Sequence, residues 1–155
     1  MYKRQAPSFS INNDILKVIE ECGYLYDSSY NSFSMQGRYG KANLSRNGKN
    51  GIAAKISDNF FELPISNINF LKSVLPWGGG GYFRLIPFPL FKVGIKFILG
   101  QENAYLFYFH PWEIDPDQPK VNNSHFFYKF RHYINLSKTH IKLSRLIEDL
   151  SLIHI

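Results

Sequence analysis

The chain is poor in cysteine, tryptophan and methionine, with one, two and two copies among 155 residues. A single cysteine, Cys22, excludes an internal disulfide and a zinc site built from cysteines. No run approaches the roughly 18 consecutive apolar residues of a membrane-spanning helix, so we expect no membrane span. The first five residues are not followed by an apolar stretch, so we also expect no secretory signal in this sequence.

The composition is that of a folded domain, with 45% hydrophobic and 19% charged residues. Aromatic residues make up 17%, which can build a large core or provide surfaces that stack on sugars. The net charge is +6, but the basic residues are spread along the chain. Because no recognition motif accompanies this charge, we expect no nucleic-acid partner. The densest basic patch lies in a Gly/Asn-rich stretch and comprises Arg38, Lys41, Arg46 and Lys49.

Both ends of the sequence look foreign to the domain. Residues 1–5 (MYKRQ) are encoded by GTG-TAT-AAG-AGA-CAG when GTG starts translation. The reverse strand, extended by one codon, encodes the LSLIHI of residues 150–155. This DNA resembles the transposon end used in preparing sequencing libraries. We therefore interpret residues 1–5 and 150–155 as library-derived scars and expect the natural polypeptide to cover about residues 6–149.

The first predicted element is a helix that ends near Cys22. Ser10 or Asn12 can cap its start, and Gly23 supplies a left-handed stop. Its apolar side predicts that Cys22 lies in the core. This side is formed by Ile11, Ile15, Val18, Ile19 and Cys22.

The remaining pattern alternates strands and helices, which is typical of an α/β chain. We expect a long polar loop over residues 28–55 and a helix of about ten residues that Pro87 and Pro89 open and that ends near Gly100. Residues 126–133 predict a helical turn or a docked aromatic segment, and Ser137 a cap for the last helix. Shorter apolar elements are expected at residues 24–27, 59–65 (interrupted by Pro64), 70–75 and 104–109.

The strongest candidate for chemistry is His110. It follows the aromatic run 104–109, which predicts a buried strand, and Pro111 then ends that strand. An imidazole at the end of a buried strand is a common acid/base group in α/β barrels. The alternative is a hydrogen-bonded core histidine. We expect His125, His132 and His140 on the surface, because none forms a metal-ligand pattern.

Two further segments are candidates for the same site. Asp27 follows a predicted strand and can either form an Asx turn or orient an imidazole. The run 78–81 of four glycines is not a P-loop, because no Gly-Lys-Ser/Thr follows it. It allows either close approach of a ligand or simple flexibility. Aromatic side chains suited to stacking on a sugar flank it: Trp77, Tyr82 and Phe83.

Five motifs occur in order along the chain: APSFS (6–10), GYLYDSS (23–29), ELPIS (62–66), GGGGYFR (78–84) and FHPWEIDP (109–116). Together they resemble the C-terminal half of polysaccharide deacetylases with NodB homology. The chain is most similar to the subgroup encoded beside exosortase and exopolysaccharide genes, which has an extra C-terminal region. The resemblance covers nearly all of residues 6–149.

This resemblance implies the C-terminal part of a distorted (β/α) barrel over residues 6–120, with an appended helical extension over residues 121–149. It implies metal-assisted hydrolysis of the acetamide of N-acetylated sugars, in an exopolysaccharide pathway of a bacterium. The partner would be an N-acetylated polysaccharide or oligosaccharide, and the compartment the cytoplasm or the cell envelope. His110 would protonate the leaving amine and Asp27 would tune it. The implied substrate contacts are Trp77, Gly80, Tyr82 and Trp112.

The sequence differs from the family in the residues that bind the metal. It has neither the family's aspartate pair nor its His-x-x-x-His motif, and Gln5 stands where an arginine is expected. The divalent metal of the parent enzyme, expected to be zinc, should therefore not be bound by this chain, and we expect no deacetylase activity from it alone. Two alternatives remain: a carbohydrate-binding module that stacks sugars on Trp77, Tyr82, Phe83 and Trp112, and a basic nucleic-acid-binding domain.

Overall fold

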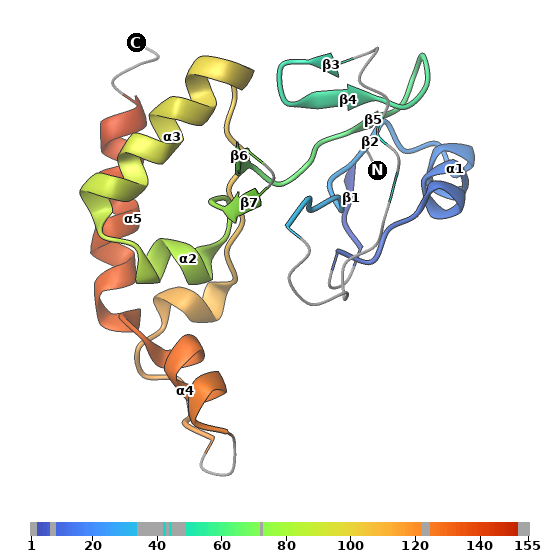
Figure 1. The fold of residues 1–155 in the computed structure, drawn as a ribbon. Helices are drawn as coiled ribbons and strands as arrows, with labels where there is room; N and C mark the ends of the chain where they lie inside the picture. Colours follow the sequence, from blue (N-terminus) through green and yellow to red (C-terminus); the bar gives the residue numbers. More distant parts are fainter. Residues whose placement is uncertain are drawn as a thin grey trace.

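The computed structural model describes residues 3–6, 9–33, 42, 44, 49–71, 73–121 and 125–151. These form a mixed α/β structure with two small sheets and no closed barrel among them, in two lobes that lie side by side (Figure 1). In this part of the chain, no helix has both the length and the apolar character needed to cross a membrane. Most of the basic patch predicted at Arg38, Lys41 and Arg46 lies outside the described residues.

The N-terminal lobe contains helix α1 (Asn13–Glu21), whose predicted ends are confirmed. The Asn12 Oδ1 accepts a hydrogen bond from the Ile15 N–H at 2.8 Å, and Gly23 has the left-handed φ of 79°. Leu16 and Ile19 face the core beside Phe60. The prediction for Cys22 is wrong, because it is exposed. It lies one turn beyond exposed Val18, on a stripe that points away from the sheet.

A five-stranded sheet forms the rest of this lobe, in the order β1 (Lys3–Arg4), β2 (Tyr26–Asp27), β5 (Phe61–Glu62), β4 (Ala53–Lys55) and β3 (Lys49–Asn50). The pairs β1–β2 and β2–β5 are parallel, and the pairs β5–β4 and β4–β3 are antiparallel. The predicted loop over residues 28–55 therefore ends in a hairpin. Its turn is Gly51-Ile52, and Gly51 has a φ of 58°, which glycine adopts at little cost. The strand β1 belongs to the segment interpreted as a scar.

The C-terminal lobe packs helices against a hairpin. Strands β6 (Asn67–Phe70) and β7 (Ser73–Pro76) pair antiparallel where a single apolar element was expected. Helix α2 (Gly80–Leu85) follows, and then α3 (Phe88–Glu102), which starts after Pro87 as predicted. The core of this lobe comprises Trp77, Phe83, Phe91, Ile95, Ile98 and Leu146.

The segment 104–109 is extended but is not the buried strand that its apolar composition predicted. Its residues are half-buried, with Phe109 exposed, and Tyr108 makes an isolated parallel bridge to Gly79. The Tyr108 N–H donates to the Gly78 oxygen at 2.8 Å, whereas the Leu106 N–H donates to the Ser66 hydroxyl at 2.8 Å. A side-chain acceptor cannot continue a strand ladder, so no regular strand forms.

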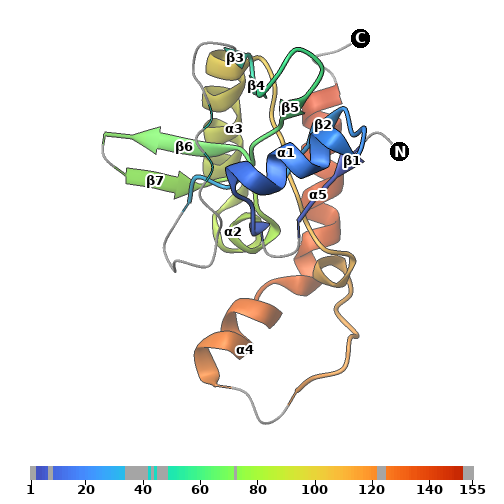
Figure 2. The same ribbon diagram turned by 90° about the vertical axis from the view of Figure 1, so that its right-hand side faces the viewer.

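The chain then forms a 3₁₀ helix, η3 (Pro111–Ile114), and two α-helices, α4 (Phe126–Tyr133) and α5 (Leu136–Ser151). Ser137 is not the cap of α5, because the helix begins one residue earlier. Asn135 turns the chain there with a φ of 54°, and its amide donates to the Arg84 oxygen at 2.8 Å. Helix α4 extends from the end of the C-terminal lobe, and none of its residues is buried (Figure 2).

Candidate functional site

His110 lies at the start of η3, and its backbone is held from both sides. The His110 N–H donates to the Glu113 Oε2 at 3.0 Å, and the Glu113 N–H donates to the His110 oxygen at 2.9 Å. The imidazole is exposed, with its ring edge-on to Tyr108 at 5.9 Å and stacked with Trp112 at 5.8 Å between centroids. The site therefore combines a fixed backbone with an accessible proton-carrying ring.

A buried ion pair holds this turn in place. The Arg84 Nη2 lies 3.0 Å from the Glu113 Oε1, and the two side chains are only 2% and 4% exposed. The Arg84 Nη1 also donates to the backbone oxygens of His132 at 2.6 Å and Ile134 at 3.2 Å. Arg84 thus ties η3 to the junction of α4 and α5. The sequence indicated Arg84 and Glu113 only as parts of motifs.

Gly80 faces the same carboxylate. A Cβ added at Gly80 would lie 2.0 Å from the Glu113 Oε2, so a side chain there would displace the carboxyl group from the N-terminus of α2. A Cβ at Gly78 would meet the Ser66 oxygen at 2.6 Å. The packing of the protein itself therefore requires glycine at these two positions, whether or not a ligand approaches them.

Trp112 belongs to a polar and aromatic cluster beside His110. Its ring stacks on His132 with centroids 4.1 Å apart, and the Arg84 guanidinium lies 5.2 Å from its centroid. The His132 Nε2 and the Gln118 Oε1 are 2.8 Å apart. Burial, followed by the Arg84 charge, lowers the pKa of His132. Trp112 is half-buried in this arrangement, and Tyr82 is half-buried with its ring edge-on to Phe33.

Trp77 lies in the core of the C-terminal lobe. Its indole N–H donates to the Phe91 oxygen at 2.9 Å, and its ring stacks on Phe91. A Cβ at Gly94 of α3 would come within 2.2 Å of the same indole. The structure therefore gives Trp77 a packing role and leaves too little of its ring exposed for a sugar to stack on.

Asp27 is fully buried and pairs in register with Glu62 across β2 and β5. The Glu62 Oε1 accepts the backbone N–H groups of Ser29 at 2.9 Å and Tyr30 at 2.7 Å. Both Asp27 oxygens and the Glu62 Oε2 have no hydrogen-bond partner among the described residues. Burial, and then the charge of Asp27, raise the pKa of Glu62 to about 8. Glu62 therefore holds a proton near neutral pH, beside the carboxyl group of Asp27.

Asp27 makes no hydrogen bond to the imidazole of His110, because neither Asp27 oxygen has a hydrogen-bond partner among the described residues. The partner of Asp27 is Glu62, to which the sequence analysis gave no role. The sequence does hold one signal for this pair: the carboxyl group of Glu62 lies between apolar residues of a short strand. Because such a group is costly to bury alone, its position indicates a buried polar partner.

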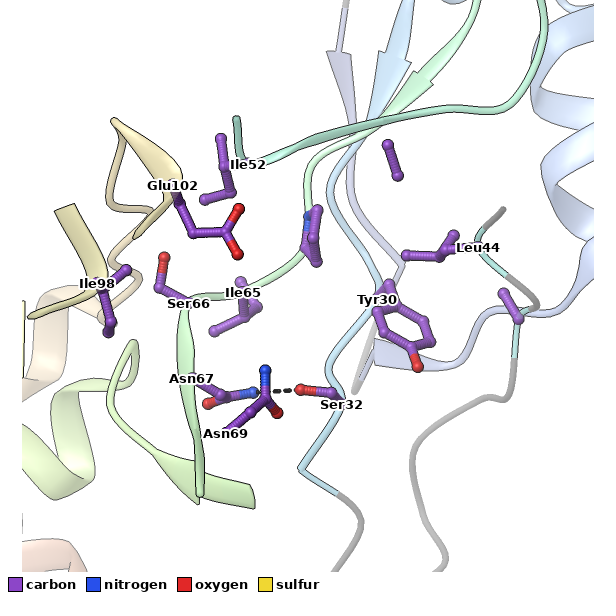
Figure 3. Close-up of a pocket in the computed structure, with 13 residues that line it drawn as sticks. Tyr30, Ser32, Leu44, Ile52, Ile65, Ser66, Asn67, Asn69, Ile98 and Glu102 are labelled. Carbon is purple, nitrogen blue, oxygen red and sulfur yellow. Dashed lines mark hydrogen bonds between the residues drawn. The ribbon is translucent and has the colours of Figure 1, made fainter. Parts of the chain in front are cut away.

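A cavity of about 640 Å³ lies between the two lobes (Figure 3). Its polar wall includes Tyr30, Ser32 and Asn69, and the Asn67 amide donates to the Ser32 hydroxyl at 3.0 Å. Ile65 and Ile98 supply apolar surface. None of the six predicted site residues lines this cavity, so the cavity and the candidate acid/base group are separate features.

The family model "Domain of unknown function (DUF3473)" matches residues 28–155. The chain belongs to this family. The DUF3473 region includes His110, Glu113, Arg84 and Glu62, whereas Asp27 precedes it by one residue. No curated protein and no solved structure matches the chain.

The side chains in the described part of the chain do not form a site for the divalent metal that the resemblance implies. Within the described ranges, no group of three or more His, Cys, Asp or Glu side chains is placed to hold a metal ion. Asp27 and Glu62 form a pair only, and a catalytic zinc needs three protein ligands and an open position. What the site offers is a positioned, exposed imidazole and, in the other lobe, a buried pair of carboxyl groups.

Proposed function

We propose that this chain is part of a metal-dependent polysaccharide N-deacetylase and that His110 is the proton donor of the site. The observation that carries the proposal is the exposed His110 imidazole on a backbone that Glu113 holds. The ordered series of five motifs supports it. So does membership of a family associated with polysaccharide deacetylase-like proteins.

Hydrolysis of the acetamide requires a proton donor close to the sugar nitrogen. Hydrolysis of an acetamide breaks the bond between the carbonyl carbon and the sugar nitrogen, and the departing amine must gain a proton. A protonated His110 ring nitrogen would donate it, which as general acid catalysis contributes about 100- to 10,000-fold in rate. The divalent ion that activates water in such enzymes would be held by residues other than those described. Trp112 and Tyr82, beside the glycine run, are the proposed contacts to an N-acetylated saccharide.

The test is the substitution His110→Asn in the protein encoded by the complete gene. We expect kcat for acetate release from an N-acetylated oligosaccharide to fall about 100-fold or more, with little change in KM, because asparagine cannot supply the proton. The matched control is His140→Asn, an exposed histidine on α5, which should leave kcat unchanged. An unchanged kcat in the His110 variant would refute the proposed role. We expect no acetate release from the 155-residue chain alone.

The alternative function is a carbohydrate-binding module, and only two of its four proposed stacking residues remain accessible to a sugar. Of its four proposed stacking residues, Trp77 and Phe83 are buried in the core, and Tyr82 and Trp112 remain half-buried. Calorimetric titration with chitooligosaccharides distinguishes the two functions. Tight binding that is lost in Trp112→Ala, together with no acetate release by the complete protein, would favour the module.

A further inference from the structure

Helix α4 presents an aromatic patch, which we define as Phe126, Phe127 and Phe130. These side chains are 72%, 71% and 49% exposed. The rings contact one another, with centroids 5.9 Å apart for Phe126–Phe127 and 6.4 Å apart for Phe126–Phe130. Three clustered phenylalanines with no polar atom are an unusual surface for a protein in water.

The patch faces away from the rest of the molecule. On the opposite side of α4, His132 stacks on Trp112. Tyr133 ends the stripe of Phe126 and Phe130, and its hydroxyl accepts a hydrogen bond from the Val121 N–H at 2.9 Å. Phe126 and Phe130 are four residues apart and share one stripe of the helix, with Phe127 beside them. Because α4 extends from one end of the C-terminal lobe (Figure 2), a broad, flat partner can reach this stripe without meeting the N-terminal lobe.

Helix α4 itself carries two basic residues, Lys129 and Arg131, and no acidic residue. Between Gln118 and Ile147 the sequence has six lysines and arginines and no aspartate or glutamate. This stretch therefore carries +6, as much as the net charge of the whole chain. Its basic residues on or next to α4 are Lys120, Lys129 and Arg131. The other three lie on α5, where Lys142 donates to the Phe83 and Ile86 oxygens and Arg145 packs over Phe88.

We propose that α4 docks the protein on an anionic membrane surface, with the aromatic patch inserted among the lipid headgroups and the basic residues against their phosphates. Phenylalanine side chains gain free energy when they leave water for the boundary of the acyl chains, and lysine and arginine are attracted to the negative surface. A two-turn helix of about 12 Å lying in the interface has the right dimension for shallow insertion. This inference does not depend on the proposed deacetylase activity.

The test is flotation of the full chain with vesicles of phosphatidylcholine that contain about one third phosphatidylglycerol. We expect binding to these vesicles, weakened at high salt, and much less binding to pure phosphatidylcholine. The double substitution Phe126→Ser, Phe130→Ser should weaken binding about tenfold or more, and Arg131→Glu about tenfold. The matched controls are Phe70→Ser and Lys17→Glu, which change an exposed phenylalanine and an exposed lysine of other elements and should bind as the unaltered chain does.

Three results would overturn the proposal. The first is equal binding by the patch variants and the controls. The second is binding of a single-stranded RNA oligonucleotide through the patch with no binding of vesicles, which would make the surface a nucleic-acid site. The third is a dimer in sedimentation that the double substitution converts to a monomer while vesicle binding stays absent, which would make the patch an interface between two copies.

Discussion

At the scale of single residues, the buried acids differ in how they are stabilised. Glu113 has a guanidinium partner at 3.0 Å, so its charge is compensated. Glu62 has two backbone N–H donors but also a second carboxyl group beside it. Its pKa therefore rises to about 8, whereas that of an unfolded glutamate is 4.5.

This shift predicts how stability depends on pH. Between pH 4.5 and about 8, the folded protein holds a proton on Glu62 that the unfolded chain has lost, so the free energy of unfolding should fall as pH rises through this range. In Glu62→Gln, the amide oxygen can still accept from Ser29 and Tyr30, and its NH₂ can donate to Asp27. We expect this variant to lose the fall in stability that Glu62 causes and to be more stable than the unaltered chain at pH 8, by on the order of 1 kcal/mol or more.

Urea unfolding at pH 5 and at pH 8 measures both effects. The control is Asp58→Asn, because Asp58 is exposed and its pKa is lowered by Lys55, so its titration lies below this range. A Glu62→Gln variant with the same fall in stability as the unaltered chain would show that another group carries the proton.

At the scale of elements, α3 makes a close contact with the indole of Trp77. Trp77 packs its indole on Gly94, and its N–H reaches the Phe91 oxygen on the same helix. Gly100, further along α3, has no heavy atom within 4 Å of an added Cβ. Gly94 and Gly100 lie on the same helix and differ in the space around them. Substitution of each by alanine therefore separates the effect of the indole contact from that of helix propensity.

We expect Gly94→Ala to destabilise the protein by about 1–3 kcal/mol, because the Cβ would lie 2.2 Å from the indole and must displace it. Gly100→Ala should stabilise it by up to about 1 kcal/mol, because alanine has the higher helix propensity and meets no atom. Thermal unfolding followed by circular dichroism compares the two. Equal effects of the two substitutions would mean that the indole contact does not fix α3.

At the scale of the whole molecule, the segment 104–109 links the lobes. Tyr108 contacts Phe9 of the N-terminal lobe, with centroids 4.8 Å apart, while its backbone pairs with the glycine run. The N–H groups of Leu106 and Tyr108 are hydrogen-bonded, whereas those of Phe107 and Phe109 find no acceptor among the described residues. One edge of this segment is therefore open among the described residues.

Amide hydrogen exchange should accordingly alternate along the segment. We expect slow exchange at Leu106 and Tyr108, and fast exchange at Phe107 and Phe109, with the buried middle of α3 around Ile95 as the protected reference. Exchange followed residue by residue by NMR measures this. Strong protection at all four positions would contradict the open edge and indicate a strand paired on both sides.

Local chemistry allowed the ends of the helices to be predicted from the sequence. Asn12 and Gly23 bound α1, and Pro87 opens α3, because a cap, a left-handed stop and a fixed φ act within a few residues of their own position. The β6–β7 hairpin was missed, because Leu71 adopts a φ of 53° there and leucine gives no sign of such a turn. The exposure of Cys22 was also missed, because an apolar residue type does not by itself show which face of a helix packs against the core.

By itself, the sequence determined the α/β character, both ends of α1, the start of α3 and His110 as the candidate acid/base group. Only the tertiary structure decided the partners of the polar groups. It placed Glu113 on Arg84, 29 residues away, turned Asp27 toward Glu62 rather than His110, and put Trp77 in the core. The physical reason is that caps and turns act over a few bonds, whereas burial and charge pairing depend on which distant segments the fold brings into contact.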